Sequence, residues 1–284
     1  MLNLTTTQIR AEIDLAAVCA GKHVFSEKPL AITREELTAG SGNSSRFRIC
    51  FIAHIRIRSR VAMPAKIVAF SASPRPRANS SIMLDSFLEG SRSVDAGVVI
   101  DVIRTEEADI LPCRGCLRCN LLKRCIVRKD GWPELSRKIL EAYILIFATP
   151  IYFHHTTSSC KKILDRFRSF VHVQITENGL IHTPHQEWNK QLVLISALGS
   201  SSDKEAQPLV DLFTSMTEMM GEGNLLHTLT GTRLAMGGQI SFSSEKLADL
   251  YEKLGLPVRL AAEDAYRNTA LLERARNLGR QCAE

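Results

Sequence analysis

Short apolar runs alternate with amphipathic stretches from residue 63 onward. The runs KIVAF, YILIFA and LVLIS show no alternation of apolar and polar positions. A parallel strand is covered by helices on both faces, so it reads as a continuous apolar run. The pattern therefore predicts buried strands that are joined by crossover helices.

The expected strands are 66–71, 98–102, 143–149, 191–197 and one within 227–236. Helices are expected at 80–88, 133–141, 157–170, 205–220, 244–254 and 262–281. Strands and helices in this order predict an α/β fold with a doubly wound, five-stranded parallel sheet and helices on both faces. In such a sheet, ligands bind beyond the carboxyl ends of the strands.

Residues 1–62 lack this regular pattern. A possible helix at 7–20 and a short strand at 23–25 are followed by polar SGNSS and by RFRICFIAHIRIRSR, which has five arginines and no acid. No complete domain is expected there, whereas Met63 begins MPAKIVAF and the first regular strand. We interpret residues 1–62 as a poorly organised N-terminal extension, a fusion remnant or a misassigned start, and residues 63–284 as the folded domain.

One segment of the extension has a specific pattern. Residues 16–33 read AAVCAGKHVFSEKPLAIT, which resembles the signature of the Gfo/Idh/MocA nicotinamide-dependent sugar dehydrogenases. In that family the Lys of E-K-P, here Lys28, lies in the catalytic site. The strand and G-x-G-x-x-G that would hold a dinucleotide are missing, so a sugar dehydrogenase is not expected.

Charge and hydropathy exclude two classes of partner. The formal net charge is +6, but residues 1–62 hold nine Lys/Arg against five Asp/Glu, which leaves 27 against 25 in the remainder. A nucleic-acid footprint needs basic residues clustered on the folded domain, so no nucleic-acid partner is expected. No apolar run reaches eighteen residues, so no membrane span is expected either.

Four cysteines fall within thirteen residues, at Cys113, Cys116, Cys119 and Cys125. The spacing C-x2-C-x2-C aims three sulfurs inward from a tight loop, and a fourth thiolate closes the cage of an iron-sulfur cluster. Gly115 allows the close turn, and the neighbouring basic residues would offset the charge of the thiolates. The spacing therefore favours a 4Fe-4S cluster and electron transfer.

Three other interpretations of this loop stay open. Structural zinc usually takes two C-x2-C pairs with a longer spacer. Disulfides are disfavoured because there is no secretory signal and the other cysteines are scattered, which predicts a reducing, cytoplasmic location. A cysteine-rich loop without any metal is the third interpretation.

Three loops after strands have the composition of a flavin site. SASPRPRANSS supplies hydroxyls and N–H groups at a helix start, as a phosphate monoester needs; its candidates are Ser71, Ser73, Arg75, Asn79 and Ser80. TPIYFHH can form a flat apolar wall for an isoalloxazine ring, with Thr149, Pro150, Ile151, Tyr152 and Phe153. SALGSSSD allows close backbone approach, with Ser196 and Gly199.

These motifs together resemble the NADPH-dependent FMN reductase superfamily. The resemblance rests on S-x-S-P-R followed by N-S and on T-P-I-Y followed by K-K-I-L-D-R, and it covers about residues 64–200. The cysteine motif makes the chain similar to the iron-sulfur flavoproteins. The resemblance implies a flavodoxin-like fold, bound FMN, a 4Fe-4S cluster near the flavin, and a homo-oligomer. Asp165 and Arg166 are expected to serve helix packing.

The expected function is that of an FMN-dependent oxidoreductase. Electrons would pass from NAD(P)H as substrate, or from a ferredoxin-like donor, through FMN and the cluster to a small-molecule or protein acceptor. The protein's part is to position the cofactors, so no catalytic side chain is expected. Two alternatives stay open: a cluster-free NAD(P)H-dependent FMN or quinone reductase, and a flavodoxin-type electron carrier without turnover.

A shortened chain that begins at Met63 is expected to fold and to bind FMN, because regular patterning starts there. Circular dichroism and flavin absorbance of the purified shortened chain would test this. Loss of cooperative unfolding in the shortened chain would contradict our interpretation of residues 1–62.

Overall fold

The computed structural model describes residues 2–3, 25–26 and 65–284. The chain divides into two compact units, Met1–Val61 and Ala62–Glu284. In the first unit, β1 (Leu2–Asn3) pairs in parallel with β2 (Phe25–Ser26). The expected helix at 7–20 and the Lys28 motif lie outside the described residues. Within the described ranges, no helix is long and apolar enough to cross a membrane.

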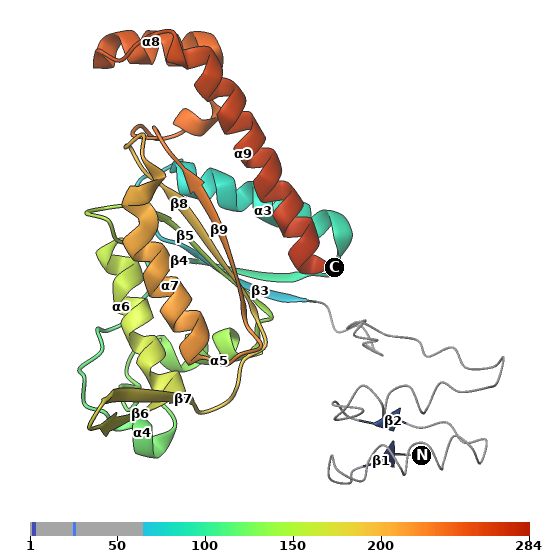
Figure 1. Ribbon diagram of the computed structural model, residues 1–284, viewed down its shortest axis with the longest axis vertical. Helices are drawn as coiled ribbons and strands as arrows, with labels where there is room; N and C mark the ends of the chain where they lie inside the picture. Colours follow the sequence, from blue (N-terminus) through green and yellow to red (C-terminus); the bar gives the residue numbers. More distant parts are fainter. Residues whose placement is uncertain (1, 4–24, 27–64) are drawn as a thin grey trace, which may run out of the picture. The chain divides into compact units, whose positions relative to one another are not determined.

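A five-stranded parallel sheet forms the centre of the second unit (Figure 1), in the order β4-β3-β5-β8-β9. Its strands are β3 (Lys66–Ser71), β4 (Val99–Arg104), β5 (Ile144–Pro150), β8 (Gln191–Ala197) and β9 (Leu225–Gly231). The first strand of this sheet lies between the second and the third, which is the flavodoxin-like strand order. The predicted fold class is confirmed.

Helices cover both faces of the sheet. One face packs against α3 (Asn79–Val94) and α9 (Leu260–Ala283), and the other against α5 (Trp132–Glu141), α6 (Ser158–Arg166) and α7 (Gln207–Met219). After β9, η3 (Gln239–Ser241) and α8 (Ser244–Leu254) lead into α9. Six of the seven residues of β5 are buried, and only Pro150 is half-buried, as expected for a strand covered on both sides.

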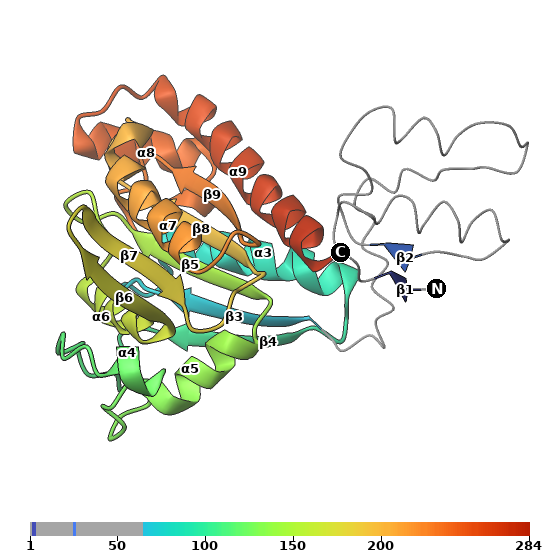
Figure 2. The ribbon, with the colours of Figure 1, turned by 60° about the horizontal axis from the view of Figure 1, so that its bottom comes forward.

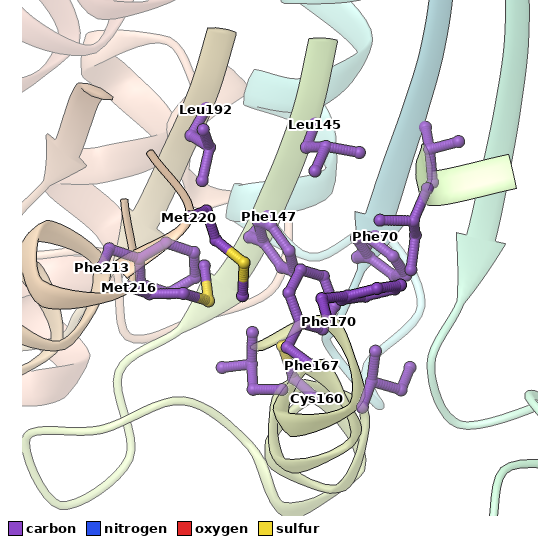
Figure 3. Close-up of a cluster of buried hydrophobic side chains, with 14 of the residues drawn as sticks. Phe70, Leu145, Phe147, Cys160, Phe167, Phe170, Leu192, Phe213, Met216 and Met220 are labelled. Carbon is purple, nitrogen blue, oxygen red and sulfur yellow. The ribbon is translucent and has the colours of Figure 1, made fainter. Parts of the chain in front are cut away.

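Aromatic rings fill the core between the sheet and α5, α6 and α7 (Figure 3). Phe70 and Phe147 stack at 4.7 Å between ring centroids, across the β3–β5 pair. Phe147 also meets Phe167 and Phe213 edge to face, at 5.9 and 4.9 Å. Such pairs add about 0.5–1.5 kcal/mol each beyond area burial. This packing fixes where α6 and the segment after it lie against the strands.

Two features depart from the expected elements. The predicted helix 157–170 ends at Arg166 and continues as η1 (Phe167–Phe170). An antiparallel hairpin follows, β6 (Val171–Thr176) and β7 (Gly179–Pro184), beside the short helix α4 (Cys119–Leu122) (Figure 2). The hairpin's turn residues are Glu177 and Asn178, and Gly179, with φ of 131°, begins β7. The sequence pattern did not predict this hairpin.

Two glycines let α3 and α9 approach closely. A Cβ at Gly279 would lie 2.0 Å from the carbonyl oxygen of Phe87, and one at Gly90 would lie 1.9 Å from that of Arg276. Ser91 Oγ donates to the Gly279 carbonyl at 3.1 Å across the same contact. The two helix backbones therefore touch where no side chain fits between them.

The Gly279→Ala variant is expected to lower the free energy of unfolding by about 2 kcal/mol, because overpacking outweighs the helix propensity that alanine adds. Urea denaturation would measure it. Arg274→Ala, at an exposed position of the same helix, serves as the control and should stay within about 0.5 kcal/mol of the parent chain. A more stable Gly279→Ala variant would show that the helices separate without cost.

Candidate functional site

The three predicted flavin loops start side by side at the carboxyl edge of the sheet. Ser71 at the end of β3 pairs with Ala148 of β5, and Thr149 pairs with Ser196 of β8. Because these strands are parallel and in register, their following loops leave the sheet at one level. The structure therefore gathers all three loops at the edge where doubly wound folds bind ligands.

The loop after β3 leaves backbone N–H groups at the start of α3 without a partner among the described residues. No side chain caps α3 at Ala78, and the N–H groups of Asn79, Ser80 and Ser81 have no acceptor among the described residues. Ser80 is 1% exposed, and its hydroxyl has no partner among the described residues. Backbone N–H groups and a free hydroxyl at a helix start suit a phosphate.

The other predicted residues of this loop have partners within the protein. Ser71 Oγ lies 3.0 Å from Ser81 Oγ, and Ser73 Oγ accepts from the Arg75 N–H at 3.3 Å. Arg75 is exposed, and its Nη1 donates to the Ala235 carbonyl at 2.7 Å. These bonds fold the loop over the start of α3.

Asn79 ties the β3 loop to the segment after β9. Its Nδ2 donates to the carbonyls of Leu234 and Met236, at 3.1 and 2.8 Å, and its Oδ1 accepts from the Ile240 N–H at 3.0 Å. An amide has only two donor hydrogens, and both are used here. The structure thus gives Asn79 a role in holding segment 234–240, and its contact with a phosphate stays a prediction.

The loop after β5 forms a tight turn at the same edge. Tyr152 and His155 bridge each other, with φ of 49° at Phe153 and 63° at His154 between them. Two consecutive positive φ values are rare without glycine and mark a strained turn. Phe153 is fully exposed at the tip, and His154 Nδ1 lies 3.1 Å from the Glu205 carbonyl. The turn presents an aromatic ring to solvent.

The remaining ring-loop candidates divide into buried and accessible residues. Thr149 Oγ1 lies 2.8 Å from Thr156 Oγ1, and Ser196 Oγ lies 2.9 Å from Thr230 Oγ1, so both hydroxyls are used inside the fold. Pro150 and Ile151 are half-buried, while Gly199 is exposed. This edge could therefore contact an isoalloxazine ring through backbone atoms and through the half-buried apolar residues.

The cysteine loop lies away from this edge, at the far end of α6. The chain after β4 follows α6 along its length: Thr105 contacts Ser159, Ala108 accepts from Lys162, and Leu111 accepts from Arg166. The flavin loops lie at the start of α6, and this nine-residue helix is about 13 Å long. Within one chain the two candidate sites thus lie at opposite ends of α6 (Figure 1).

All four cysteines of the motif line one hollow and carry free thiols. Arg114, Arg166 and Arg168 line it too, with no acidic side chain among its lining residues. Left-handed backbone at Gly115, Leu117 and Lys123 turns the loop back on itself. The Gly115 N–H donates to Cys113 Sγ at 3.5 Å, and Arg168 Nη1 lies 3.6 Å from Cys119 Sγ.

Burial and charge act in opposite directions on Cys119. Burial raises the pKa of its thiol, and the nearby Arg168 guanidinium opposes this rise. Within the part of the chain that is described, no three His, Cys, Asp or Glu side chains come close enough to share a single metal ion. The thiols face a common hollow without converging on one point.

A five-stranded parallel sheet covered on both faces, with open loops at its carboxyl edge, defines a flavodoxin-like α/β protein. The family model for NADPH-dependent FMN reductase matches residues 65–225, more than half of the chain, and the chain belongs to this family. It is a family of oxidoreductases, and the predicted resemblance is confirmed.

Individual relatives extend the comparison. An iron-sulfur flavoprotein of Methanocaldococcus jannaschii is 28% identical over 103 residues, which cover 36% of this chain and 52% of that protein. One of Archaeoglobus fulgidus is 31% identical over 107 residues, covering 38% and 47%. The chain spans about half the length of these curated relatives.

The fold is also similar to that of solved structures. An azoreductase from Bacillus anthracis str. Sterne has a TM-score of 0.51 at 16% identity, over 76% of this chain and 99% of that one. Smu.1420 from Streptococcus mutans UA159 has a TM-score of 0.50 at 12% identity, over 76% and 99%. At such low identity these likenesses show the fold alone.

The Asn79→Ala variant is expected to lower the free energy of unfolding by about 2–3 kcal/mol, because three backbone groups lose their hydrogen bonds, two of them buried. Thermal denaturation would measure the loss, and hydrogen exchange should rise within segment 234–240. Asp85→Asn, an exposed position on the same helix, is the control. Unchanged exchange in that segment would show that Asn79 does not hold it.

Proposed function

We propose that this protein is an FMN-dependent oxidoreductase with a 4Fe-4S cluster, an iron-sulfur flavoprotein. It moves electrons from NAD(P)H or a ferredoxin-like donor to a small-molecule or protein acceptor. The observation that carries the proposal is the set of four free thiols lining one arginine-rich hollow, in a chain of the FMN reductase family.

FMN occupies the carboxyl edge of the sheet in this proposal. The unpaired N–H groups at the start of α3 and the unpartnered Ser80 hydroxyl support phosphate binding there. Pro150, Ile151 and Tyr152 offer an apolar wall for the ring, and Gly199 leaves the backbone accessible. FMN supplies hydride and single-electron chemistry, and the loops hold and orient it.

The arrangement of the thiols favours a cluster over zinc. Structural zinc usually takes two C-x2-C pairs with a longer spacer, whereas the motif here has the spacing C-x2-C-x2-C-x5-C. A 4Fe-4S cluster takes one thiolate on each iron, so it needs four thiols around one hollow. A ligated cluster is anionic, and Arg114, Arg166 and Arg168 are the charged side chains that line the hollow.

Association of several copies would join the two cofactors. Within one chain the flavin edge and the cysteine hollow lie at opposite ends of α6. A homo-oligomer can place the hollow of one copy near the flavin edge of another, and fully exposed Phe153 on that edge suits such a contact. The proposal includes a cytoplasmic, reducing location, which would keep these thiols available as ligands.

The second candidate is a cluster-free NAD(P)H-dependent FMN or quinone reductase. It is favoured by the family match, whose description names FMN and no cluster. In that case the loop carries thiols that bind no metal. The two candidates differ in iron content, and they share the flavin.

Anaerobic purification followed by measurement of FMN, iron and acid-labile sulfide tests the proposal. About four irons and four sulfides for each FMN would support it. FMN without iron would leave the cluster-free reductase, and absence of FMN would overturn the assignment of the three loops.

The Cys116→Ala and Cys119→Ala variants are expected to lose their iron and sulfide and to keep their FMN, because the hollow and the flavin edge are separate. Elemental analysis and flavin absorbance of the same samples would show this. Cys282→Ala, at a buried cysteine of α9 within the core on the α3 and α9 face of the sheet, is the control and should keep both cofactors. Full iron content in both loop variants would refute the cluster assignment.

A further inference from the structure

Arg166, at the end of α6, joins the two ends of the cysteine loop. Its Nη1 donates to the Leu111 carbonyl at 2.7 Å, and its Nη2 donates to the Val127 carbonyl at 3.1 Å. Leu111 lies two residues before Cys113, and Val127 lies two residues after Cys125. The sequence led us to expect only helix packing from this side chain. It instead bonds to both stems, at Leu111 and Val127, of the loop that carries all four thiols.

Asp130 bonds to the same guanidinium and to the first stem of the loop. Its Oδ2 accepts from Arg166 Nη1 at 2.6 Å and from the Leu111 N–H at 3.0 Å, and its Oδ1 accepts from the Trp132 N–H at 3.2 Å. Burial by itself would raise the pKa of Asp130. The bond from Arg166 and those from the two N–H groups outweigh burial and hold this pKa below its usual range. The carboxylate therefore stays charged beside the guanidinium.

The pair is almost fully buried, with side-chain exposures of 0% for Arg166 and 1% for Asp130. A buried ion pair adds little net stability compared with apolar packing, and its best-attested use is to select one arrangement of the chain. Here it selects the closed form of a loop that is otherwise exposed and strained at Leu117 and Lys123.

One donor of the guanidinium is left over. Nε of Arg166 is buried and has no partner among the described residues, and Arg166 itself lines the cysteine hollow. A buried N–H without an acceptor is unfavourable, so an acceptor in the hollow would stabilise the site. Sulfur atoms of a bound cluster accept such hydrogen bonds, and these bonds help to set its reduction potential.

We propose that Arg166 is a positioning residue for the cysteine hollow. With Asp130 it holds both stems of loop 111–127 together before metal arrives, and it offers its Nε–H to a sulfur of the bound cluster. The inference rests on the cluster of the proposed function for its second part, while the tie between the stems concerns this chain alone.

Three variants separate the contributions of geometry and charge. Arg166→Lys keeps the charge but lacks the planar fork that reaches two carbonyls and a carboxylate. Arg166→Met removes the charge, and the double variant Arg166→Met/Asp130→Asn also removes the unpaired carboxylate that could prevent folding. Arg137→Met is the matched control, since its guanidinium pairs with Glu141 on the exposed side of α5.

Amide hydrogen exchange of the metal-free protein measures whether Arg166 holds the two stems of the loop together. All three Arg166 variants are expected to exchange faster across loop 111–127, with FMN content and exchange in the sheet unchanged. After reconstitution with iron and sulfide, they are expected to lose iron to a chelator at least about tenfold faster than the parent, in the range typical of groups that orient metal ligands. The cluster that remains should have a more negative reduction potential, because a donor to sulfur is lost.

Unchanged loop exchange together with unchanged iron loss and potential would overturn the inference. Joint loss of FMN and of sheet protection in all three variants would overturn it too, since Arg166 would then be a general folding residue. A parent protein that takes up no iron would instead refute the proposed cluster. The exchange comparison would in that case still decide whether Arg166 ties the loop.

Discussion

Burial of the parallel strands on both faces is the constraint on which the rest of this structure depends. Strands β3, β5 and β8 have almost no exposed side chain, so each needs a helix above and a helix below. Their backbone groups must pair within the sheet because no water reaches them. Pairing in register then brings the carboxyl ends to one level, and this places three loops with hydroxyls, apolar side chains and free N–H groups side by side.

The two candidate sites lie at opposite ends of helix α6. Its start follows the strained turn after β5, and its last residue contacts both stems of the cysteine loop. The aromatic core under the sheet holds the segment after α6 in place, through Phe167 and Phe170 against Trp132. The distance between the carboxyl edge of the sheet and the cysteine hollow is thus set by the packing of one short helix, whatever either site binds.

Backbone strain within the described residues is confined to the loops around these sites. The non-glycine residues with positive φ are Arg77, Leu117, Lys123, Phe153, His154 and Arg233. They lie after β3, in the cysteine loop, after β5 and after β9. Such conformations persist only where neighbouring contacts determine them, as Arg166 and Asn79 do for two of these loops. Strain at these places fits sites that are shaped before a ligand binds.

The sequence by itself determined the parallel sheet, because continuous apolar runs are a local property of each strand. It also predicted a ligand set at the cysteine motif and a phosphate site at the loop after β3, because the chemistry of each lies in neighbouring residues. Only the tertiary structure decided the partners of Asn79, which are 155 to 161 residues away, and the contacts of Arg166 with both ends of the cysteine loop. Hydrogen bonds over such separations depend on how helices pack on the sheet. No local period or spacing encodes that packing.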